Sequence, residues 1–154
     1  MTDMLKSLSR LLVVVIVASG AWAAGGHESP VADAAERGDK TAVTSLLQKQ
    51  ADVNAPQSDG ATALHWAAYN NDVETTAALL RAGAKVNVKN DLGVTPLALA
   101  AQQGGAAVIE QLIKAGAAPN DPANFVNAGE TPLMHAARAG SPDAVKVRLR
   151  AGAD

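Results

Sequence analysis

The side chains that could perform chemistry are few and scattered along the 154 residues of this chain. No cysteine is present, which excludes disulfides, thiolate metal ligands and cysteine nucleophiles. His27, His65 and His135 share no ligand spacing, and the sequence contains no Gly-x-Ser-x-Gly, phosphate-binding glycine loop, His-Glu-x-x-His or EF-hand pattern. We therefore expect no catalytic residue, no metal site, no cofactor and no enzyme activity.

One stretch, Gly25-Gly26-His27, would bind a metal ion if it stood at a free amino terminus. An amine, two backbone amides and an imidazole form a square-planar set that suits Cu(II) or Ni(II). Cleavage after Ala24 would expose this set, but that cut places Trp22 where a small residue is favoured. The sequence favours cleavage after Ala23, which leaves no chelating terminus, and N-terminal sequencing distinguishes the two cuts.

The first 23 residues have the pattern of a Sec-type signal peptide. This segment contains two cations, then an apolar run, then two small residues before the cleavage point: Lys6, Arg10, Leu11–Ala18, Ala21 and Ala23. Because the apolar run is well below the roughly 20 residues that span a bilayer, a cleaved leader is favoured over a retained anchor. We expect an exported protein, periplasmic or extracellular, with residues 1–23 removed, no stable membrane span and a short linker over residues 24–30.

The composition favours closely packed helices. The chain contains 34 alanines and only four aromatic residues, so a core of native density requires backbones that approach one another closely. The net charge is −2 and the isoelectric point is about 5.9. These values argue against nucleic acid as a partner, because phosphate binding requires a concentrated basic surface.

One segment recurs along the chain with a period of 33 residues. Gly60 opens Gly-Ala-Thr-Ala-Leu-His-Trp-Ala-Ala, and Gly93 opens Gly-Val-Thr-Pro-Leu-Ala-Leu-Ala-Ala. A third copy, Gly-Glu-Thr-Pro-Leu-Met-His-Ala-Ala, opens at Gly129, 36 residues further on, which indicates an insertion of three residues. A degenerate first copy without the Thr-Pro-Leu opening occupies residues 31–54.

The residue types within each copy predict two helices. Thr62, Thr95 and Thr131 carry hydroxyls that can cap the first helix, and Pro96 and Pro132 suit its first position in two of the copies. Residues that tolerate a left-handed backbone end it: Gly38, Asn71, Gly104 and Gly140. An apolar stripe follows on the second helix, with Val73, Leu79 and Leu80 in one copy and Val108, Leu112 and Ile113 in the next. The alanine pairs at 67–68, 100–101 and 136–137 mark the helix contacts.

These segments resemble the ankyrin repeat, and the resemblance covers residues 31–154. It implies an all-α solenoid of about four stacked helix-turn-helix units joined by β-turn or hairpin loops. The expected units are residues 31–54, 57–87, 90–120 and 121–154, the last one incomplete. In the family pattern, the histidine that His65 matches is a structural residue that hydrogen-bonds between neighbouring loops. Ala98 and Met134 replace that histidine, and Arg148 stands where a buried leucine is expected.

The resemblance implies that the protein binds another protein, as a monomer, through its loop tips and the exposed face of its first helices. The matching positions are Ser58, Asp59, Ala61, Tyr69, Asn70, Lys89, Asp91, Leu92, Val94, Gln102, Gln103, Asn127, Glu130, Arg138 and Ala139. Tyr69 is the expected hot spot, because an exposed tyrosine offers contact area and a hydroxyl at low entropic cost. The alternative for Tyr69 is packing against the next repeat.

The insertion lengthens the loop over residues 119–126, which two prolines stiffen and which has Phe125 near its tip. We expect Phe125 either to contact the partner or to fold back onto the array. A second hypothesis for the whole chain is a docking or sensory arm of a longer protein whose effector lies beyond residue 154. The downstream coding sequence would distinguish the two.

Overall fold

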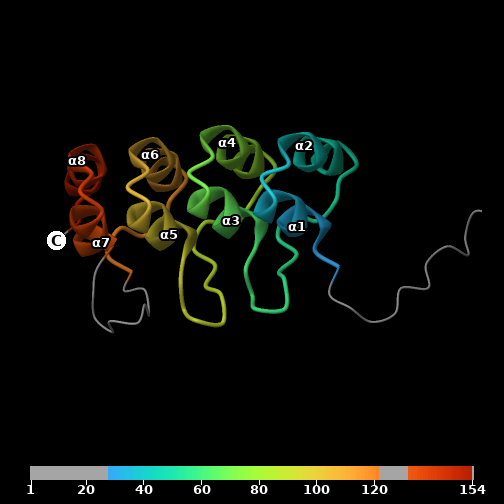
Figure 1. Ribbon diagram of the computed structural model, residues 1–154, viewed down its shortest axis with the longest axis horizontal. Helices are drawn as coiled ribbons and strands as arrows, with labels where there is room; N and C mark the ends of the chain where they lie inside the picture. The colour runs from blue at the N-terminus through green and yellow to red at the C-terminus, as the bar shows by residue number, and fades with distance from the viewer. Residues whose placement is uncertain (1–27, 122–131, 154) are drawn as a thin grey trace, which may run out of the picture.

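The computed structural model describes residues 28–121 and 132–153, which form a row of four helix pairs (Figure 1). The first helices of the pairs each contain 7 residues: α1 Pro30–Glu36, α3 Ala63–Tyr69, α5 Pro96–Gln102 and α7 Pro132–Arg138. The second helices each contain 9 residues: α2 Lys40–Gln48, α4 Val73–Arg81, α6 Ala106–Lys114 and α8 Pro142–Arg150. No strand occurs in the described ranges. The prediction of an all-α solenoid of about four repeats is confirmed.

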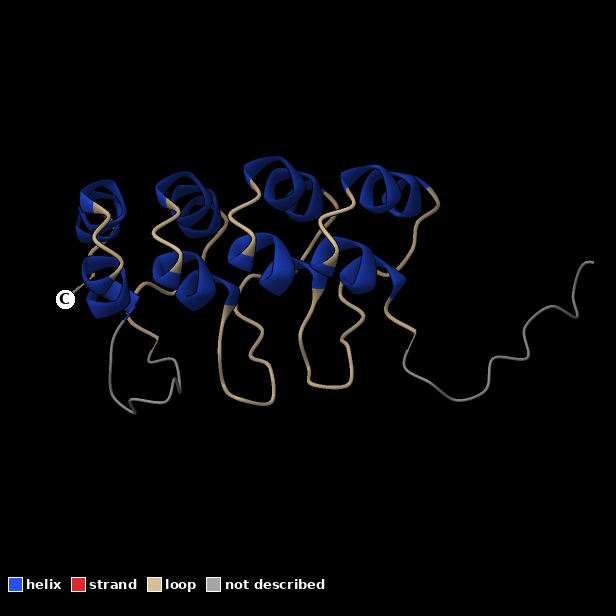
Figure 2. Cartoon of the chain, viewed as in Figure 1, coloured by secondary structure: helices blue, strands red, loops and turns tan. Residues whose placement is uncertain are grey.

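The helices form two layers. Each first helix packs against the next first helix, and each second helix packs against the next second helix, while the two helices of a pair pack on each other. The connecting loops project from the first-helix layer, on the side away from the second helices (Figure 2). This arrangement places the loop tips in a row along one side of the array.

The helix ends follow the local chemistry that the sequence predicts. Gly38 and Asn71 both adopt a left-handed backbone after the first helix of their repeats, with φ of 68° and 51°. Asp39 and Asp72 then begin the second helices by accepting hydrogen bonds from backbone N–H groups of the first turn. In the third repeat, Thr95 caps α5 by accepting from the N–H of Ala98 at 3.2 Å.

The core consists mainly of alanines of the first helices and aliphatic residues of the second helices. Ala67, Ala68, Ala100 and Ala101 are at most 1% exposed, which explains the surplus of alanine, because the first helices lie in direct contact. Ala137 differs from the other paired alanines, because it lies exposed in the last described helix pair.

The apolar stripe of the second helices is also only partly buried. Leu79, Val108 and Leu112 are fully buried, and Leu80 and Ile113 are half-buried. Val73 was predicted to belong to this stripe and is 40% exposed. Val73 occupies the first position of α4, and the buried position that Val108 takes one repeat later is taken here by Thr75, which is 5% exposed.

Asparagines that recur with the repeat connect each unit to the next. The side-chain amide of Asn87 donates to the carbonyl of Gly116 at 3.0 Å, and its oxygen accepts from the N–H of Ala118 at 3.0 Å. Asn54 makes the same pair of contacts with Gly83 and Lys85 one repeat earlier. Each of these side chains satisfies polar backbone groups left at the end of the neighbouring second helix.

Arg148 occupies the buried leucine position of the last repeat. The residue is 0% exposed, and its Nη2 donates to the carbonyl of Pro119. Among the residues that the structure describes, its Nε and Nη1 have no hydrogen-bond partner. Burial lowers the pKa of this guanidinium to about 10, so the charge is held in an unfavourable environment.

Several sequence-based predictions fall outside the described residues. These are the signal peptide over residues 1–23, most of the linker, and Phe125, Asn127, Glu130 and Thr131. The first helix begins at Pro30, the last residue assigned to the linker. None of the helices in the described ranges is long and apolar enough to cross a membrane.

Candidate functional site

The candidate site is the surface formed by the loop tips and the exposed side of the first helices. Most of the predicted contact residues in the described ranges lie exposed there: Ser58, Asp59, Tyr69, Asn70, Lys89, Asp91, Leu92, Gln102, Gln103, Arg138 and Ala139. The exposed fraction is 71% for Leu92 and 46% for Tyr69. Two large apolar side chains are therefore available to a partner from adjacent repeats.

Two predicted contact positions are wrong. Ala61 and Val94 are each only 4% exposed. Both follow the loop tip and lead into the next helix, and Val94 packs against Ala98 and Leu99 of α5. The backbone N–H of Asp91 donates to the carbonyl of Asp59 at 2.9 Å, which holds the two tips side by side. A Cβ added at Gly60 would meet Asp91 Oδ1 at 2.9 Å, so a glycine is needed for this close approach.

A hollow of about 280 Å³ lies on this surface between the second and third repeats. It is lined by Asp59, Ala61, His65, Trp66, Tyr69, Asn90 and Leu99, and we call it the aromatic hollow. Trp66 and Tyr69 form an edge-to-face pair with ring centres 6.1 Å apart and an interplanar angle of 87°. Tyr69 therefore packs against a residue of its own helix, and 46% of it remains exposed.

Trp66 is held in place by a glutamine that the sequence analysis did not identify. The indole N–H donates to Gln57 Oε1, and Gln57 Nε2 donates to Asp33 at 2.8 Å and to Glu36 at 2.9 Å. This chain of hydrogen bonds links the aromatic hollow to two carboxylates of the first repeat. Only the fold brings these residues together, because Gln57 is 21 and 24 positions from the two acids.

His65 performs the structural role that the family pattern implies. Its Nε2 donates to the carbonyl of Val94 in the next loop at 3.0 Å, and its Nδ1 accepts from the backbone N–H of Thr62 at 3.0 Å. A carbonyl only accepts and an N–H only donates, so the ring is neutral with the proton on Nε2. Burial lowers the pKa of His65, against weaker opposing effects from the Val94 carbonyl and the Asp59 charge. The ring is therefore not available as an acid–base group at the surface.

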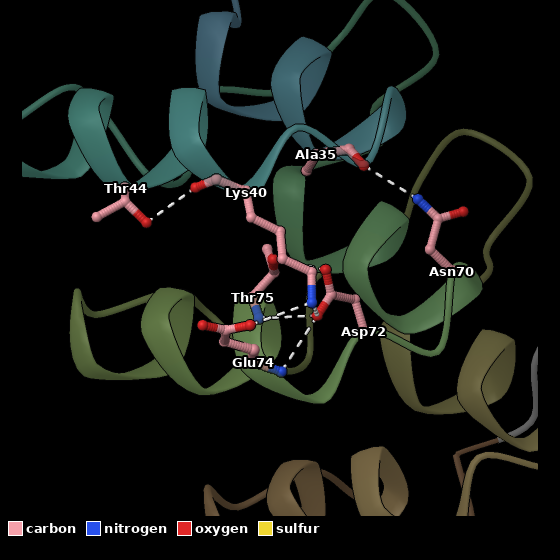
Figure 3. A network of polar contacts seen from close by, with 7 residues as sticks. All are labelled: Ala35, Lys40, Thr44, Asn70, Asp72, Glu74 and Thr75. Atoms are coloured by element: carbon pink, nitrogen blue, oxygen red, sulfur yellow. Dashed lines mark hydrogen bonds and ion pairs between the residues drawn. The ribbon is translucent and has the colours of Figure 1, made fainter.

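A polar network joins the first two repeats at the turn between their helices (Figure 3). Lys40 Nζ lies 3.1 Å from Asp72 and 3.2 Å from Glu74, and hydrogen bonding to Asp72 and Glu74 raises the pKa of Lys40. Partial burial raises the pKa of Asp72, but hydrogen bonds from Thr75 and Lys40 outweigh it and the net pKa is lowered. These contacts hold the turn before α4 against the start of α2.

Two predicted contact residues also make such structural contacts. Asn70 Nδ2 donates to the carbonyl of Ala35 at 3.0 Å, from α3 to α1, as Figure 3 shows. Lys89 Nζ lies 2.8 Å from Asp121 Oδ1, one repeat further along the chain. Both side chains remain exposed. The polar groups of Asn70 and Lys89 thus stabilise the stacking of neighbouring repeats. These two side chains are therefore less available to a partner than Tyr69 or Leu92.

No group of three or more histidine or carboxylate side chains within the described ranges could hold a metal ion. The surface instead combines exposed apolar side chains, a small aromatic hollow and scattered carboxylates, which suits contact with another macromolecule.

Comparison with known proteins adds one finding. A family model described as ankyrin repeats, in three copies, matches residues 13–90, 31–123 and 68–154. No curated protein matches the chain.

Proposed function

Because the chain belongs to the ankyrin-repeat family, whose repeats form protein–protein interaction modules, we propose that it is an exported, non-catalytic protein that captures another protein. The contact surface is the row of loop tips and the exposed side of the first helices. In this proposal the protein acts as a monomer, needs no cofactor and does not bind nucleic acid.

The exposure of large apolar side chains on neighbouring repeats carries this proposal. Leu92 stands at a loop tip with 71% of its surface exposed, and Tyr69 lies beside the aromatic hollow with 46% exposed. Tyrosine is among the residues on which binding energy concentrates, and Leu92 adds exposed apolar area from the next repeat. One hydrogen bond between the Asp59 and Asp91 backbones holds the loop tips in place before a partner arrives, which lowers the entropic cost of binding.

Capture of a partner from the exported fraction tests the surface. We expect Leu92→Ser to reduce capture roughly tenfold or more without lowering the melting temperature, because the side chain is exposed. Leu149→Ser is the matched control, since Leu149 is 53% exposed but lies on α8, in the layer of second helices. Equal loss of capture in both variants would contradict the assignment of the surface.

Export is tested separately. We propose that residues 1–23 are removed and that the mature chain begins at Ala24. N-terminal sequencing of the protein from the periplasmic or secreted fraction is expected to find Ala24 first, and replacing two apolar residues of the leader with lysine should retain the protein inside the cell. Recovery of a chain that still begins at Met1 in the cytoplasm would refute export.

A further inference from the structure

The aromatic hollow has the size of a site for one side chain. Its volume is about 280 Å³, which lies below the roughly 300–1,000 Å³ of pockets that enclose a whole small molecule. The hollow sits on the proposed contact surface, between Tyr69 and the loop of the third repeat. A partner protein that covers this surface would therefore place a single side chain in it.

The lining combines apolar area with groups that attract positive charge. Trp66 and Tyr69 contribute aromatic rings, whose faces carry negative electrostatic potential. Leu99 contributes aliphatic area, and Asp59 contributes an exposed carboxylate at the rim. One oxygen of that carboxylate, Oδ1, accepts from the N–H of Ala61 at 2.9 Å.

Other carboxylates are linked by hydrogen bonds to residues that line the hollow. Asp91 is bound to Asp59 through the backbone, and Asp33 and Glu36 hold Gln57, which in turn holds the Trp66 indole. Lys89, a cation of the third-repeat loop, is paired with Asp121. The local charge is therefore negative, although the whole chain carries only −2.

We propose that the hollow binds an arginine side chain of the partner protein, an assignment that rests on the proposed protein-binding function. The aliphatic stem of an arginine would cover Leu99, and its planar guanidinium would lie against the aromatic pair and donate to Asp59. An acidic side chain would be repelled by Asp59 and Asp91. A neutral apolar side chain would remove water from the Asp59 carboxylate without replacing its hydrogen bonds.

A short peptide with one arginine, Ac-Gly-Arg-Gly-amide, is the probe for this assignment. In the full chain carrying Trp22→Phe, Trp66 is the only tryptophan, so its fluorescence reports on the hollow alone. We expect the arginine peptide to change the emission of Trp66 in a saturable manner that weakens with added salt. The same peptide with citrulline has nearly the same shape without the charge, and we expect its affinity to be at least about fivefold lower.

Variants of the hollow make the test specific. Asp59→Asn keeps an oxygen that can accept from the N–H of Ala61 but removes the charge, so the loop is retained and arginine affinity should fall roughly three- to tenfold. Tyr69→Leu removes a ring and should lower affinity roughly threefold. Glu110→Gln, at an exposed carboxylate of α6 paired with Lys114, is the control and should change nothing.

The outcomes separate this inference from the proposed function. Equal affinity for the arginine and citrulline peptides, or an unchanged affinity after Asp59→Asn, would overturn the arginine assignment. If capture of a partner protein still depends on Leu92 in that case, the protein-binding function stands and only the ligand of the hollow is wrong. If the arginine peptide binds but Leu92→Ser leaves capture intact, the arginine assignment stands and the part of the contact surface around Leu92 is wrong.

Discussion

Replacing Arg148 with methionine is expected to stabilise the protein, although the change removes a hydrogen bond. The guanidinium is fully buried in the last described repeat, and only its Nη2 has a hydrogen-bond partner there, the carbonyl of Pro119. A methionine follows the same unbranched path and carries no charge. It also restores the apolar character of a position that the repeat pattern gives to leucine.

The expected gain follows from the burial of the charge. Burial lowers the pKa of Arg148 to about 10, well below the ordinary value of an arginine. At about 1.4 kcal/mol for each tenfold change in proton affinity, holding the charge costs roughly 3 kcal/mol. Leaving the Pro119 carbonyl unpaired costs about 1–2 kcal/mol, so Arg148→Met should raise the free energy of unfolding by roughly 1–2 kcal/mol. The arginine stays charged well above neutral pH, so this gain should not vary between about pH 5 and pH 9.

Urea denaturation followed by circular dichroism measures this change. The urea midpoint of Arg148→Met should rise, and the melting temperature should increase by roughly 3–8 °C. Arg150→Met is the matched control, because Arg150 is exposed two residues further along the same helix and its replacement should change stability by less than about 0.5 kcal/mol. A lower midpoint for Arg148→Met would refute the reasoning, because it would mean that the guanidinium is well partnered in the native protein.

Three further predictions concern the contacts between repeats. Burial lowers the pKa of His65 in the native protein, so on acidification the unfolded chain binds a proton before the native protein does. The free energy of unfolding should therefore fall as the pH drops from about 7.5 to about 5. Urea titrations of His65→Gln should show a shallower decline with pH, and a decline equal to that of the unsubstituted protein would contradict the assignment of a buried neutral ring. Asn87→Ala removes two hydrogen bonds between repeats and should lower the free energy of unfolding by about 1–3 kcal/mol, whereas Lys85→Ala should lower it by less than about 0.5 kcal/mol. Gly38 and Gly104 both have φ of 68°, but of the two only Gly104 has a neighbour that a Cβ would meet, the Cβ of Ser141 at 3.0 Å. Gly104→Ala should therefore lower the melting temperature more than Gly38→Ala. The reverse order would be inconsistent with the described packing.

Local sequence signals were sufficient to predict the helices and their ends. Thr95 caps α5 and Pro96 begins it, and Asn71 adopts the left-handed backbone expected of a residue in the place of glycine. These features depend on residues within one turn of each other, so spacing alone identifies them. The fold followed because the same local signals recur at a fixed period.

The candidate site was predictable only in outline. Which loop residues are exposed depends on the loop of the neighbouring repeat, and a single repeat does not contain that information. Ala61 and Val94 were placed on the surface for this reason and are buried. Gln57 was missed, because its partners Asp33 and Trp66 lie in two different repeats and only stacking brings the three together.

The side-chain hydrogen bonds described between repeats join residues 21 to 35 positions apart, roughly one repeat length. The described fold therefore has low contact order, and any junction between two helix pairs can nucleate folding and let the others add in sequence. The same property affects how such a chain can evolve. Duplication of a 33-residue segment such as residues 55–87 would recreate the Asn87 contacts at the new junction, so the array can lengthen by whole units while each existing junction keeps its partners.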